Sequence, residues 1–476
     1  MVEHTKLKIL SREMPADLET PVSAFLKLQT IGAKILLESV ESATRLGRYS
    51  FIGMKPESRI TVYDNRISLQ NGTKSESLLY TEPDAPLSGL RSILNRFSVE
   101  EIDDRPPLLG GAVGFISYDF IRFFENIPNY SGDTLHLPPA MLYLIDTLLV
   151  FDHVRRNIKV LSLTTGDKDS AAAKKIDSVI NTLRSPLIHP SGNGNITSSK
   201  KPASNFTQDD FCRAVTEVQK HIIAGDVYQQ VISQRLEGET EADPFMIYRA
   251  LRMLNPSPYM YFLDFDDIKL IGSSPEALVR LENDIATVRP IAGTRPRGNT
   301  PEEDDKMAVE LFNDAKERAE HVMLVDLGRN DLGRCCRIGS VNVTEFMNIE
   351  RYSHVMHMTS NVTGKLKEDM DQFDLFKAAF PAGTVTGAPK IKSMELIENI
   401  ETTRRGPYAG AVGYFSLSGD MDWCINIRTI LMKDKKYYLQ AGAGIVADSI
   451  PEMEYLETKN KIAALQKAIE NAEGGI

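Results

Sequence analysis

Two pairs of glutamates stand three residues apart on stretches that have the pattern of helices. Glu317 and Glu320 lie in KERAEHVMLVD, and Glu454 and Glu457 lie in PEMEYLETKNK. Residues three apart share one face of a helix, so each pair presents two carboxylates to the same place. Such a pair suits Mg²⁺, which takes one or two carboxylates and keeps positions for water and an anionic ligand. Taken alone, each pair fits a solvated acidic face better than a metal site.

Two other stretches carry groups with the chemistry of general acids and bases. Glu276 follows a strand-like run and a proline turn in SSPEALV. An apolar wall there would raise its pKa and make it a general acid, although by itself it fits a turn residue better. His354 and His357 stand three apart in RYSHVMHM. In a strand such side chains point to opposite faces, so a shared zinc site is not expected and one histidine is free to face a pocket.

Anion binding is indicated by one arginine and by glycine-rich stretches. Arg428 stands among apolar residues in WCINIRTI, which predicts a central strand. A buried arginine there needs either a substrate carboxylate or a structural ion pair. In QAGAGIV, Gly442 and Gly444 would let backbone N–H groups approach an anion, and a β-bulge fits equally well. The stretch PAGTVTGAPKIKS lacks the Gly-Lys-Ser/Thr of a phosphate loop; the helix expected at Pro389 would attract a carboxylate.

Several helices and strands are predicted to position these groups. One helix runs from a Thr207 cap to Gly225, a long helical block runs from Pro301 to about Leu327, and a terminal helix starts near Pro451. Strands are predicted for GAVGYFSL, WCINIRTILM and KYYLQAGAGIV, and residues 1–185 alternate short strand-like runs with turns. Strand pairs alternate with helices without regular βαβ units, which predicts an α+β fold with antiparallel sheets.

Length and composition limit the class of protein. The 476 residues exceed one compact core, so two lobes or one intertwined body are expected. A breaker-rich linker or exposed loop at 186–205 separates residues 1–185 from residues 206–476. The net charge of −10 argues against nucleic acid or an anionic membrane as a partner. Without a signal-peptide core, a bilayer-spanning apolar stretch or CxxC spacing among the four cysteines, the chain is expected to be cytoplasmic and reduced.

The motifs are weak one by one but specific in their order. Residues 36–53, LLESVESATRLGRYSFIG, are similar to the amino-terminal part of anthranilate synthase component I, one branch of the chorismate-utilising enzymes. The resemblance implies a four-layer α/β/β/α fold in which two large antiparallel sheets pack orthogonally. From about Phe206 to the end, the chain resembles that whole family through GDVYQQVISQR, NPSPYMYF, SSPEALV, RPIAGTRPRG, ERAEHVMLVDLGRNDLGR, RYSHVMHMTSNV, FPAGTVTGAPKIKSMELI and QAGAGIVADSIPEMEYLETKNK.

The resemblance also implies a role for each candidate residue. Mg²⁺ between Glu320 and Glu457 would anchor the ring carboxylate of chorismate, with Glu317 and Glu454 as nearby or water-mediated ligands. Glu276 would protonate the departing C4 hydroxyl. The implied acid–base group of the elimination is His357, and the implied chorismate-binding residues are Gly293 and Thr294 at the ring, Tyr408, Arg428, Gly442, Ala443 and Gly444 at the enolpyruvyl carboxylate, and Lys461 as a balancing charge.

The implied reaction is amination of chorismate at C2 with loss of the C4 hydroxyl, followed by elimination of pyruvate to give anthranilate. On this reading the stretch VRPIAGTRPRG, residues 288–298, is a loop that binds a ring and not a phosphate. The aminodeoxychorismate branch usually has lysine in place of Ala292, and isochorismate and salicylate synthases usually have lysine in place of Gln229. The alternatives are an aminodeoxychorismate or aminodeoxyisochorismate synthase without that lysine, and a non-catalytic tryptophan-binding paralogue. Retention of the acid, base, metal and arginine positions argues against the paralogue.

Regulation and partners are implied by the same resemblance. The reaction is the first committed step of tryptophan biosynthesis, with L-tryptophan as feedback inhibitor. No Gly-x-Cys-x-Gly elbow of a glutaminase is present, so ammonia is expected either free or from a separate glutamine amidotransferase subunit, component II, in a heterotetramer. Glu38 would face the ammonium of tryptophan. The implied tryptophan-binding residues are Glu38, Ser39, Pro258, Tyr259, Met260, Val412 and Tyr414.

Overall fold

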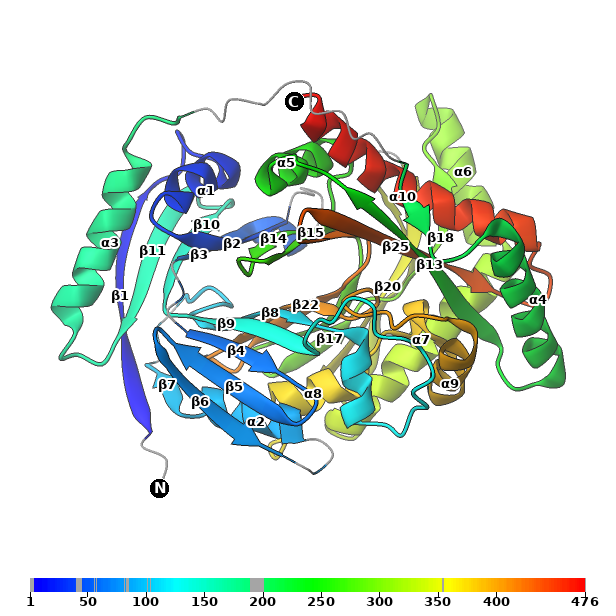
Figure 1. Ribbon diagram of the computed structural model, residues 1–476, viewed down its shortest axis with the longest axis horizontal. Coiled ribbons are helices and arrows are strands. Elements are labelled where there is room, and N and C mark those ends of the chain that lie inside the picture. Colours follow the sequence, from blue (N-terminus) through cyan, green and yellow to red (C-terminus); the bar gives the residue numbers. More distant parts are fainter. Residues whose placement is uncertain are drawn as a thin grey trace.

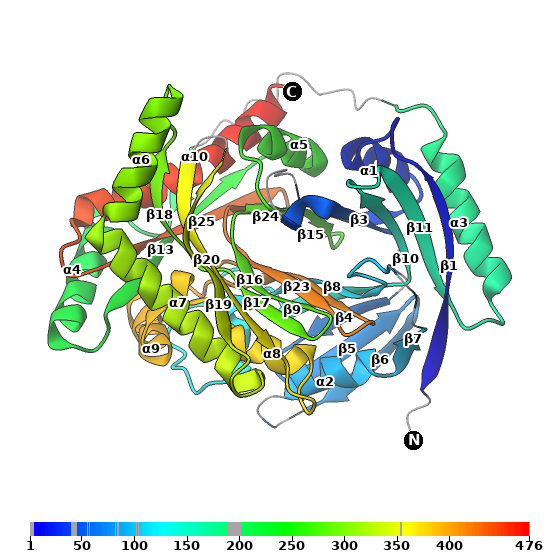
Figure 2. The ribbon, with the colours of Figure 1, turned by 180° about the vertical axis from the view of Figure 1, so that it is seen from behind.

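The computed structural model describes residues 4–39, 45–54, 56, 58–80, 82, 85–100, 102, 104–188, 201–352 and 355–475. Two large sheets lie face to face, with helices over the outer face of each (Figure 1). Figure 2 shows the same layers from behind. The predicted α+β class with two large sheets is confirmed. In the described part of the chain, no helix is both long and apolar enough to cross a membrane.

The first sheet has 13 strands, taken from both ends of the chain. Its pairs are antiparallel except for β1 and β7, which run parallel and depart from the antiparallel prediction. The short strand β21 (Gly387–Ala388) pairs with β13 outside the main path. In order across the sheet, the strands are β12 (Ala203–Ser204), β13 (Gln229–Glu239), β25 (Lys436–Ile445), β24 (Thr429–Lys433), β15 (Ile268–Ser274), β14 (Tyr259–Asp264), β2 (Ala33–Glu38), β3 (Tyr49–Met54), β10 (Thr147–Asp152), β11 (Asn157–Thr164), β1 (Thr5–Pro15) and β7 (Phe97–Val99).

The second sheet has 12 strands, and its recorded pairs are antiparallel. Like the first sheet, it mixes strands from residues 1–185 with strands from residues 206–476, so the two parts of the chain share both sheets. In order, the strands are β18 (Ile291–Pro296), β20 (Val355–Lys365) with β19 (Asn342–Arg351) beside it, β17 (Ile285–Val288), β16 (Ala277–Glu282), β23 (Met421–Ile425), β22 (Ala411–Ser416), β8 (Gly111–Ile116), β9 (Ala140–Ile145), β4 (Ser58–Val62), β5 (Arg66–Asn71) and β6 (Lys74–Leu79).

Three layers of apolar side chains hold this arrangement together. One lies between the two sheets. Another lies between the first sheet and α1 (Pro21–Gln29), α3 (Asp169–Leu183), α5 (Pro244–Leu254) and α10 (Pro451–Glu473), with α4 (Gln208–Ala224) over a smaller cluster. The third lies between the second sheet and α2 (Ala85–Leu94), α7 (Ala315–Cys335), α8 (Gln372–Ala379), α9 (Lys390–Ile400) and the 3₁₀ turns η2 (Tyr118–Phe123) and η3 (Gly383–Val385). The turn η1 (Arg45–Arg48) precedes β3, and α6 (Pro301–Asn313) precedes α7.

The predicted helix after Thr207 is confirmed, whereas the predicted block from Pro301 to about Leu327 is two helices. Asp314 leaves the helical region with φ −67° and ψ 112°, so it ends α6 and begins α7. Its carboxylate caps α7 by accepting from the Lys316 N–H at 3.0 Å and the Glu317 N–H at 3.1 Å. The break places Glu317 in the first turn of a new helix, where a carboxylate is favoured by the helix dipole.

The predicted single strand WCINIRTILM is wrong. The chain leaves the second sheet after β23 and enters the first sheet at β24, and Arg428 stands at this crossing with φ +52°. Arginine seldom adopts that backbone region, so the surrounding contacts must hold it. The buried Asn426 supplies such contacts: its N–H donates to the Gly410 carbonyl at 2.8 Å and its own carbonyl accepts from the Ala409 N–H at 2.9 Å.

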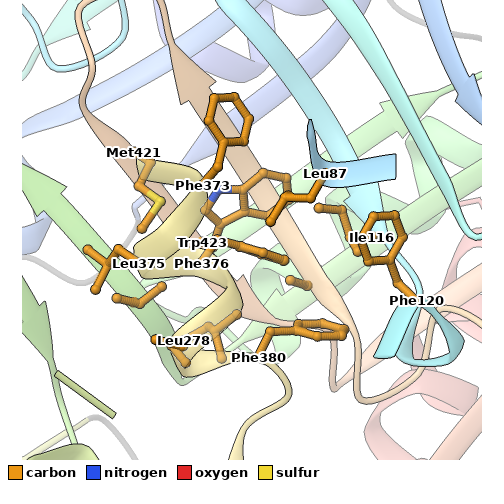
Figure 3. Packing of buried hydrophobic residues seen from close by; sticks show 14 of the residues in the cluster. Leu87, Ile116, Phe120, Leu278, Phe373, Leu375, Phe376, Phe380, Met421 and Trp423 are labelled. Carbon is orange, nitrogen blue, oxygen red and sulfur yellow. The ribbon is translucent and has the colours of Figure 1, made fainter. Parts of the chain in front are cut away.

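The strand that leads to this crossing is anchored in the core below the second sheet. Trp423, the one tryptophan of the chain, lies on β23 and is fully buried. Its ring centroid lies 4.8 Å from that of Phe415 and 5.2 Å from that of Phe376, which comes from α8 (Figure 3). Aromatic packing of this kind fixes β23 rigidly, and with it the start of the crossing.

Candidate active site

Four carboxylates from two helices gather at one side of the site. α7 carries Glu317 and Glu320, and α10 carries Glu454 and Glu457. Burial raises the pKa of Glu320, the hydrogen bond from Gln229 opposes this shift, and the charges of Glu317 and Glu457 add to it. Burial likewise raises the pKa of Glu454, with a contribution from Glu457. The two pairs therefore act on each other across the space between the helices.

This arrangement suits a hard divalent cation that keeps open positions. The Nε2 of Gln229 donates to Glu320 Oε1 at 3.2 Å, which holds that carboxylate in place. Within the described residues, no three His, Cys, Asp or Glu side chains converge as a complete ligand set. Mg²⁺ does not require such a set, because water and substrate oxygens complete its coordination beside one or two carboxylates. The carboxylate donors therefore fit Mg²⁺, and they do not fit a closed zinc site.

Lys461 links the acidic side to the glycine-rich end of β25. Its Nζ lies 2.5 Å from Glu457 Oε1 and donates to the Gly442 carbonyl at 2.9 Å. A Cβ on Gly442 would lie 2.8 Å from the Tyr408 hydroxyl oxygen, so only glycine leaves the tyrosine its place. The side chain of Ala443 packs into the cluster under α4. Only the backbone of that residue is left to face the site.

Arg428 is a half-buried cation that lacks an anionic partner. Among the described residues, its one hydrogen bond is from Nη1 to the Lys461 carbonyl at 3.4 Å, and no carboxylate lies within 4.0 Å of its guanidinium. Burial lowers the pKa of Arg428, and the neighbouring Tyr408 and Glu457 oppose this shift. The structural ion pair that the sequence left open is therefore not found in the described part of the chain. An unpaired guanidinium in this setting calls for an anionic ligand.

His357 is held in one tautomer by the strand beside it. β18 was expected to be a loop, but it pairs with β20 around a bulge at Gly293, where φ is +66°. The bulge aims the Gly293 carbonyl at His357, whose Nδ1 lies 3.1 Å from that oxygen and 3.0 Å from Thr294 Oγ1. Since a carbonyl only accepts, Nδ1 carries the hydrogen and Nε2 is left as a base. Burial lowers the pKa of His357, which favours this neutral form. His354 lies outside the described residues.

Glu276 stands next to the crossing between the sheets. Its carbonyl accepts from the Ile425 N–H at 3.0 Å, which ties the turn before β16 to the end of β23. Burial raises the pKa of its carboxyl to about 7, while Thr384 and Lys461 act in the opposite direction. A carboxyl with this pKa holds a proton near neutral pH, as a general acid requires.

Two of the three arginines in the stretch 288–298, Arg295 and Arg297, are occupied by structural ion pairs beside α6 and α7. Arg295 Nη1 donates to Glu317 Oε1 at 3.0 Å and Nη2 donates to Asp314 Oδ2 at 2.8 Å. Arg297 Nε donates to Asp304 Oδ1 at 2.7 Å. Neither arginine therefore serves a phosphate, and Arg295 instead fixes Glu317 beside the acidic site.

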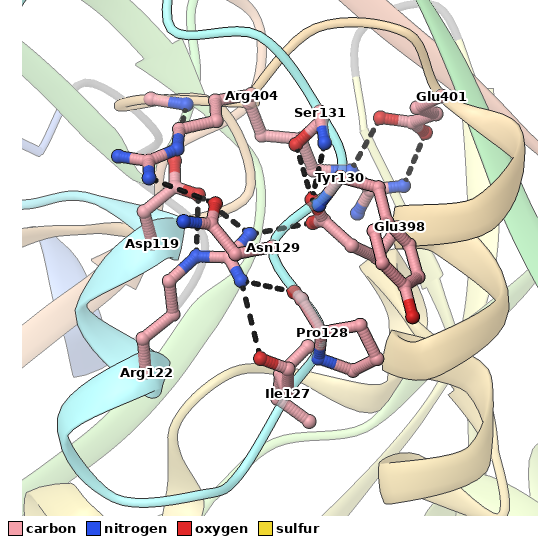
Figure 4. Close-up of polar contacts among 12 residues, drawn as sticks. Asp119, Arg122, Ile127, Pro128, Asn129, Tyr130, Ser131, Glu398, Glu401 and Arg404 are labelled. Atoms are coloured by element: carbon pink, nitrogen blue, oxygen red, sulfur yellow. Dashed lines mark hydrogen bonds and ion pairs between the residues drawn. The ribbon is translucent and has the colours of Figure 1, made fainter.

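A buried polar network, which the sequence analysis did not single out, supports the wall of the site. Arg405 and Glu401 pair at 2.6 Å with almost no exposure, and the Arg405 guanidinium lies over the Tyr408 ring at 5.7 Å. In the last turn of α9, Glu398 accepts from the Tyr130 and Ser131 N–H groups and from Arg122, which anchors residues 127–131 on that helix (Figure 4). The sequence of residues 127–131 gave no signal for these long-range contacts.

A separate cavity of about 710 Å³ lies between the two sheets. All of the residues implied for tryptophan line it: Glu38, Ser39, Pro258, Tyr259, Met260, Val412 and Tyr414. Tyr259 bridges the sheets, since its hydroxyl donates to Asp422 Oδ1 at 3.0 Å. Met260 packs its side chain in the core under the helices, because neighbours on a strand alternate, so it meets the cavity with its backbone. The Ser39 hydroxyl is buried without a hydrogen-bond partner among the described residues.

The Glu38 carboxylate is already engaged by α5. It accepts from the Tyr248 hydroxyl, from Arg252 Nε at 3.1 Å and from Arg252 Nη2 at 3.2 Å. An ionised carboxylate has about four acceptor positions, so one remains for a ligand ammonium. The α5 pair therefore holds the Glu38 carboxylate on the helix side of the first sheet, the face that the opposite residue Met260 shares, with its side chain 2% exposed.

Comparison with known proteins agrees with this geometry. The model of the chorismate binding enzyme family matches residues 32–467. The chain belongs to this family. Anthranilate synthase component 1 of Acetivibrio thermocellus is 46% identical, over 97% of this chain and 95% of that protein. The crystal structure of anthranilate synthase component I from Streptococcus pneumoniae superposes with a TM-score of 0.80 at 38% identity, over 90% of this chain and 94% of that one. Anthranilate synthase component 1 of Aquifex aeolicus is 44% identical, over 98% of this chain and 95% of that protein.

One charged group of this chorismate-binding enzyme was missed from the sequence. Arg280 lines the cavity between the sheets, together with Glu282 and Asp422. Its Nη2 donates to Glu282 at 2.5 Å, and its Nε lies 4.0 Å from Asp422 Oδ2. Arginine in the alternating stretch ALVRLE reads as an outward-facing residue of a half-exposed strand. The first sheet, which packs against this face of β16, makes it an inner one.

The raised pKa of Glu276 predicts how the rate depends on pH. Its protonated form is present below about pH 7 and is lost above it, so kcat/KM at constant free ammonia should fall about tenfold per pH unit above that value. His357 does not limit this range, because burial lowers its pKa below 6.5. In Glu276→Gln this pH dependence should disappear, and the rate should fall about 10²- to 10⁴-fold. The exposed Glu302→Gln is the control, and an unchanged kcat/KM through pH 8 would contradict the assignment.

Proposed function

We propose that the chain is the aminase component of anthranilate synthase. It converts chorismate and ammonia to anthranilate and pyruvate, the first committed step of tryptophan biosynthesis. The observation that carries the proposal is Arg428, a half-buried guanidinium without a carboxylate partner, set across from four glutamates on α7 and α10. Such a site has one end for a carboxylate bound by cationic and backbone groups and another end for a carboxylate bound through a metal.

The two ends divide the charge of a dianionic substrate. Arg428, Tyr408 and the backbone at 442–444 take the enolpyruvyl carboxylate, and Lys461 compensates the negative charge of Glu457. Glu320 and Glu457 would hold Mg²⁺, with Glu317 and Glu454 nearby. When bound, Mg²⁺ supplies positive charge for the ring carboxylate. Gly293 and Thr294 lie beside His357 and line the ring.

Protons are moved by two groups of the chain. Glu276 donates its proton to the C4 hydroxyl, which leaves as water while ammonia bonds to C2. The amine then loses its extra proton. His357, with Nε2 unprotonated, takes the C2 hydrogen as a base, and the enolpyruvyl group leaves as pyruvate after its methylene carbon gains a proton. The low pKa of His357 and the high pKa of Glu276 match a base and an acid that work at one pH.

The residues at two positions support the ortho product. Ala292 is 9% exposed on β18 and has no group that attacks carbon, so C2 stays open to ammonia. Gln229 is committed to Glu320 through its amide and cannot activate water as lysine would. We propose that ammonia comes from a separate glutamine amidotransferase, component II, and that L-tryptophan inhibits from the cavity between the sheets.

Product analysis tests this function. With chorismate, Mg²⁺ and an ammonium salt, the protein should release anthranilate and pyruvate in equal amounts, and a chelator should stop the reaction. Glu457→Gln should need a higher Mg²⁺ concentration to reach half of its maximal rate. Glu452→Gln on the same helix should behave as the unaltered protein. A para-amino or non-aromatic amino product would assign the chain to the aminodeoxychorismate or aminodeoxyisochorismate class. No turnover with tryptophan still bound would make it a sensor.

Glu38→Gln should weaken inhibition by tryptophan and leave synthesis nearly unchanged. A hydrogen bond to a charged group contributes about 1.5–3 kcal/mol, so the inhibition constant should rise about 10- to 100-fold. Tyr248→Phe removes a neighbour of Glu38 but keeps its charge, and should change inhibition far less. Inhibition constants from anthranilate fluorescence provide the measurement. Equal constants for Glu38→Gln and the unaltered protein would remove Glu38 from the effector site.

A further inference from the structure

A small cavity lies against Glu276 on the side of α7. It has a volume of about 40 Å³ and is lined by Glu276, by Asp331 of α7, by Gly383 and Thr384 of η3, and by apolar neighbours. Apart from Glu276, no residue to which we assign chorismate or metal binding lines it. The cavity is therefore a second compartment that shares only the acid with the substrate site.

Two polar atoms in this cavity wall lack partners. Asp331 is 6% exposed, and its Oδ2 accepts from Lys390 Nζ at 3.1 Å, but its Oδ1 has no hydrogen-bond partner among the described residues. The Thr384 hydroxyl also has none at hydrogen-bond distance within that part of the chain, although it approaches the Glu276 carboxyl closely enough to lower the pKa of that group as a hydrogen-bond donor. Buried polar atoms seldom remain unpaired in native proteins, and ordered water is a common partner.

The size of the cavity suits this partner. A water molecule needs about 10–15 Å³ of cavity volume and two or more polar contacts, so the cavity of about 40 Å³ holds about three waters. The Asp331 carboxylate, the Thr384 hydroxyl and the Glu276 carboxyl supply those contacts. Arg289, a cation that lines the cavity, is already paired with Glu350. Burial raises the pKa of Asp331, which favours its protonated form. The charge of Lys390 opposes this shift and favours the ionised form, which can accept a proton.

The chemistry of the proposed reaction gives such a compartment a role. Glu276 gives its proton to the hydroxyl that leaves as water, and it must regain one proton before the next turnover. The substrate site is filled at that moment by product and bordered by positive charge from Lys461 and Arg428. A route that avoids the substrate site would return the proton without waiting for product release.

We propose that water held by Asp331 and Thr384 in this cavity forms the route by which Glu276 is reprotonated. The proposal rests on the proposed function of Glu276 as the acid. One proton from bulk water enters, Asp331 accepts it and passes it through the bound water to the Glu276 carboxylate, and Asp331 returns to its anionic state. No other bond forms or breaks. Asp331 and Thr384 are thus positioning residues that act through Glu276 and never touch the substrate.

Asp331→Asn and Thr384→Val test the route by kinetics. Both should lower kcat for anthranilate by about tenfold or more, enlarge the solvent deuterium isotope effect and leave the KM for chorismate unchanged. Imidazole buffer should restore kcat by supplying protons. Thr384→Ser, which keeps the hydroxyl, and Asp326→Asn, an exposed change on α7, should match the unaltered enzyme. An unchanged kcat in both relay variants, or a loss with raised KM that imidazole does not restore, would overturn the proposal.

A high-resolution crystal structure separates this inference from the proposed function. It should show ordered water within hydrogen-bond distance of Asp331 Oδ1 and Thr384 Oγ1, whatever product the protein makes. A dry cavity would overturn the water route even in an active anthranilate synthase. Failure to make anthranilate would overturn the role of Glu276 instead, and water in the cavity would then stand as a structural feature only.

Discussion

The contact of Lys461 with Glu457 and with the Gly442 carbonyl is the interaction on which the site depends. Four glutamates on two helices repel one another. The two helices are held in place by apolar side chains that are buried away from the site, among them Ile462 and Leu465 of α10. Lys461 offsets part of that repulsion and fixes the acidic helix to β25. The same contact joins the side proposed to hold the metal to the side proposed to hold a carboxylate.

The crossing from β23 to β24 connects this site to both sheets. β23 carries Trp423 in the core and Cys424 on the wall of the larger cavity, and Arg428 follows a few residues later. Tyr259 of the first sheet bonds to Asp422 of β23 across that cavity. A ligand in the cavity therefore contacts the element that holds Arg428. Feedback inhibition needs a difference in ligand affinity between two arrangements of such a shared element.

The sequence predicted the residue types of the site better than their backbone. Helical spacing placed both glutamate pairs correctly, because that pattern is local. The turn at Arg428 and the bulge at Gly293 were missed, since each is imposed by partners far along the chain: Asn426 with Ala409 for the first, and β20 for the second. The break at Asp314 had a local signal, an Asn-Asp pair before Ala315, which the acidic run of α6 obscured. Arg280 could not be assigned to an inner face without knowing that the first sheet covers that side of β16.

A binding measurement shows whether metal and arginine divide the two carboxylates of chorismate. Calorimetry with the Glu276→Gln variant, which should bind without turnover, would compare chorismate affinity with Mg²⁺ and with a chelator. Chorismate should bind at least about tenfold more tightly with Mg²⁺, or by about 1.4 kcal/mol, because only then are both carboxylates compensated. Equal affinity under both conditions would contradict it.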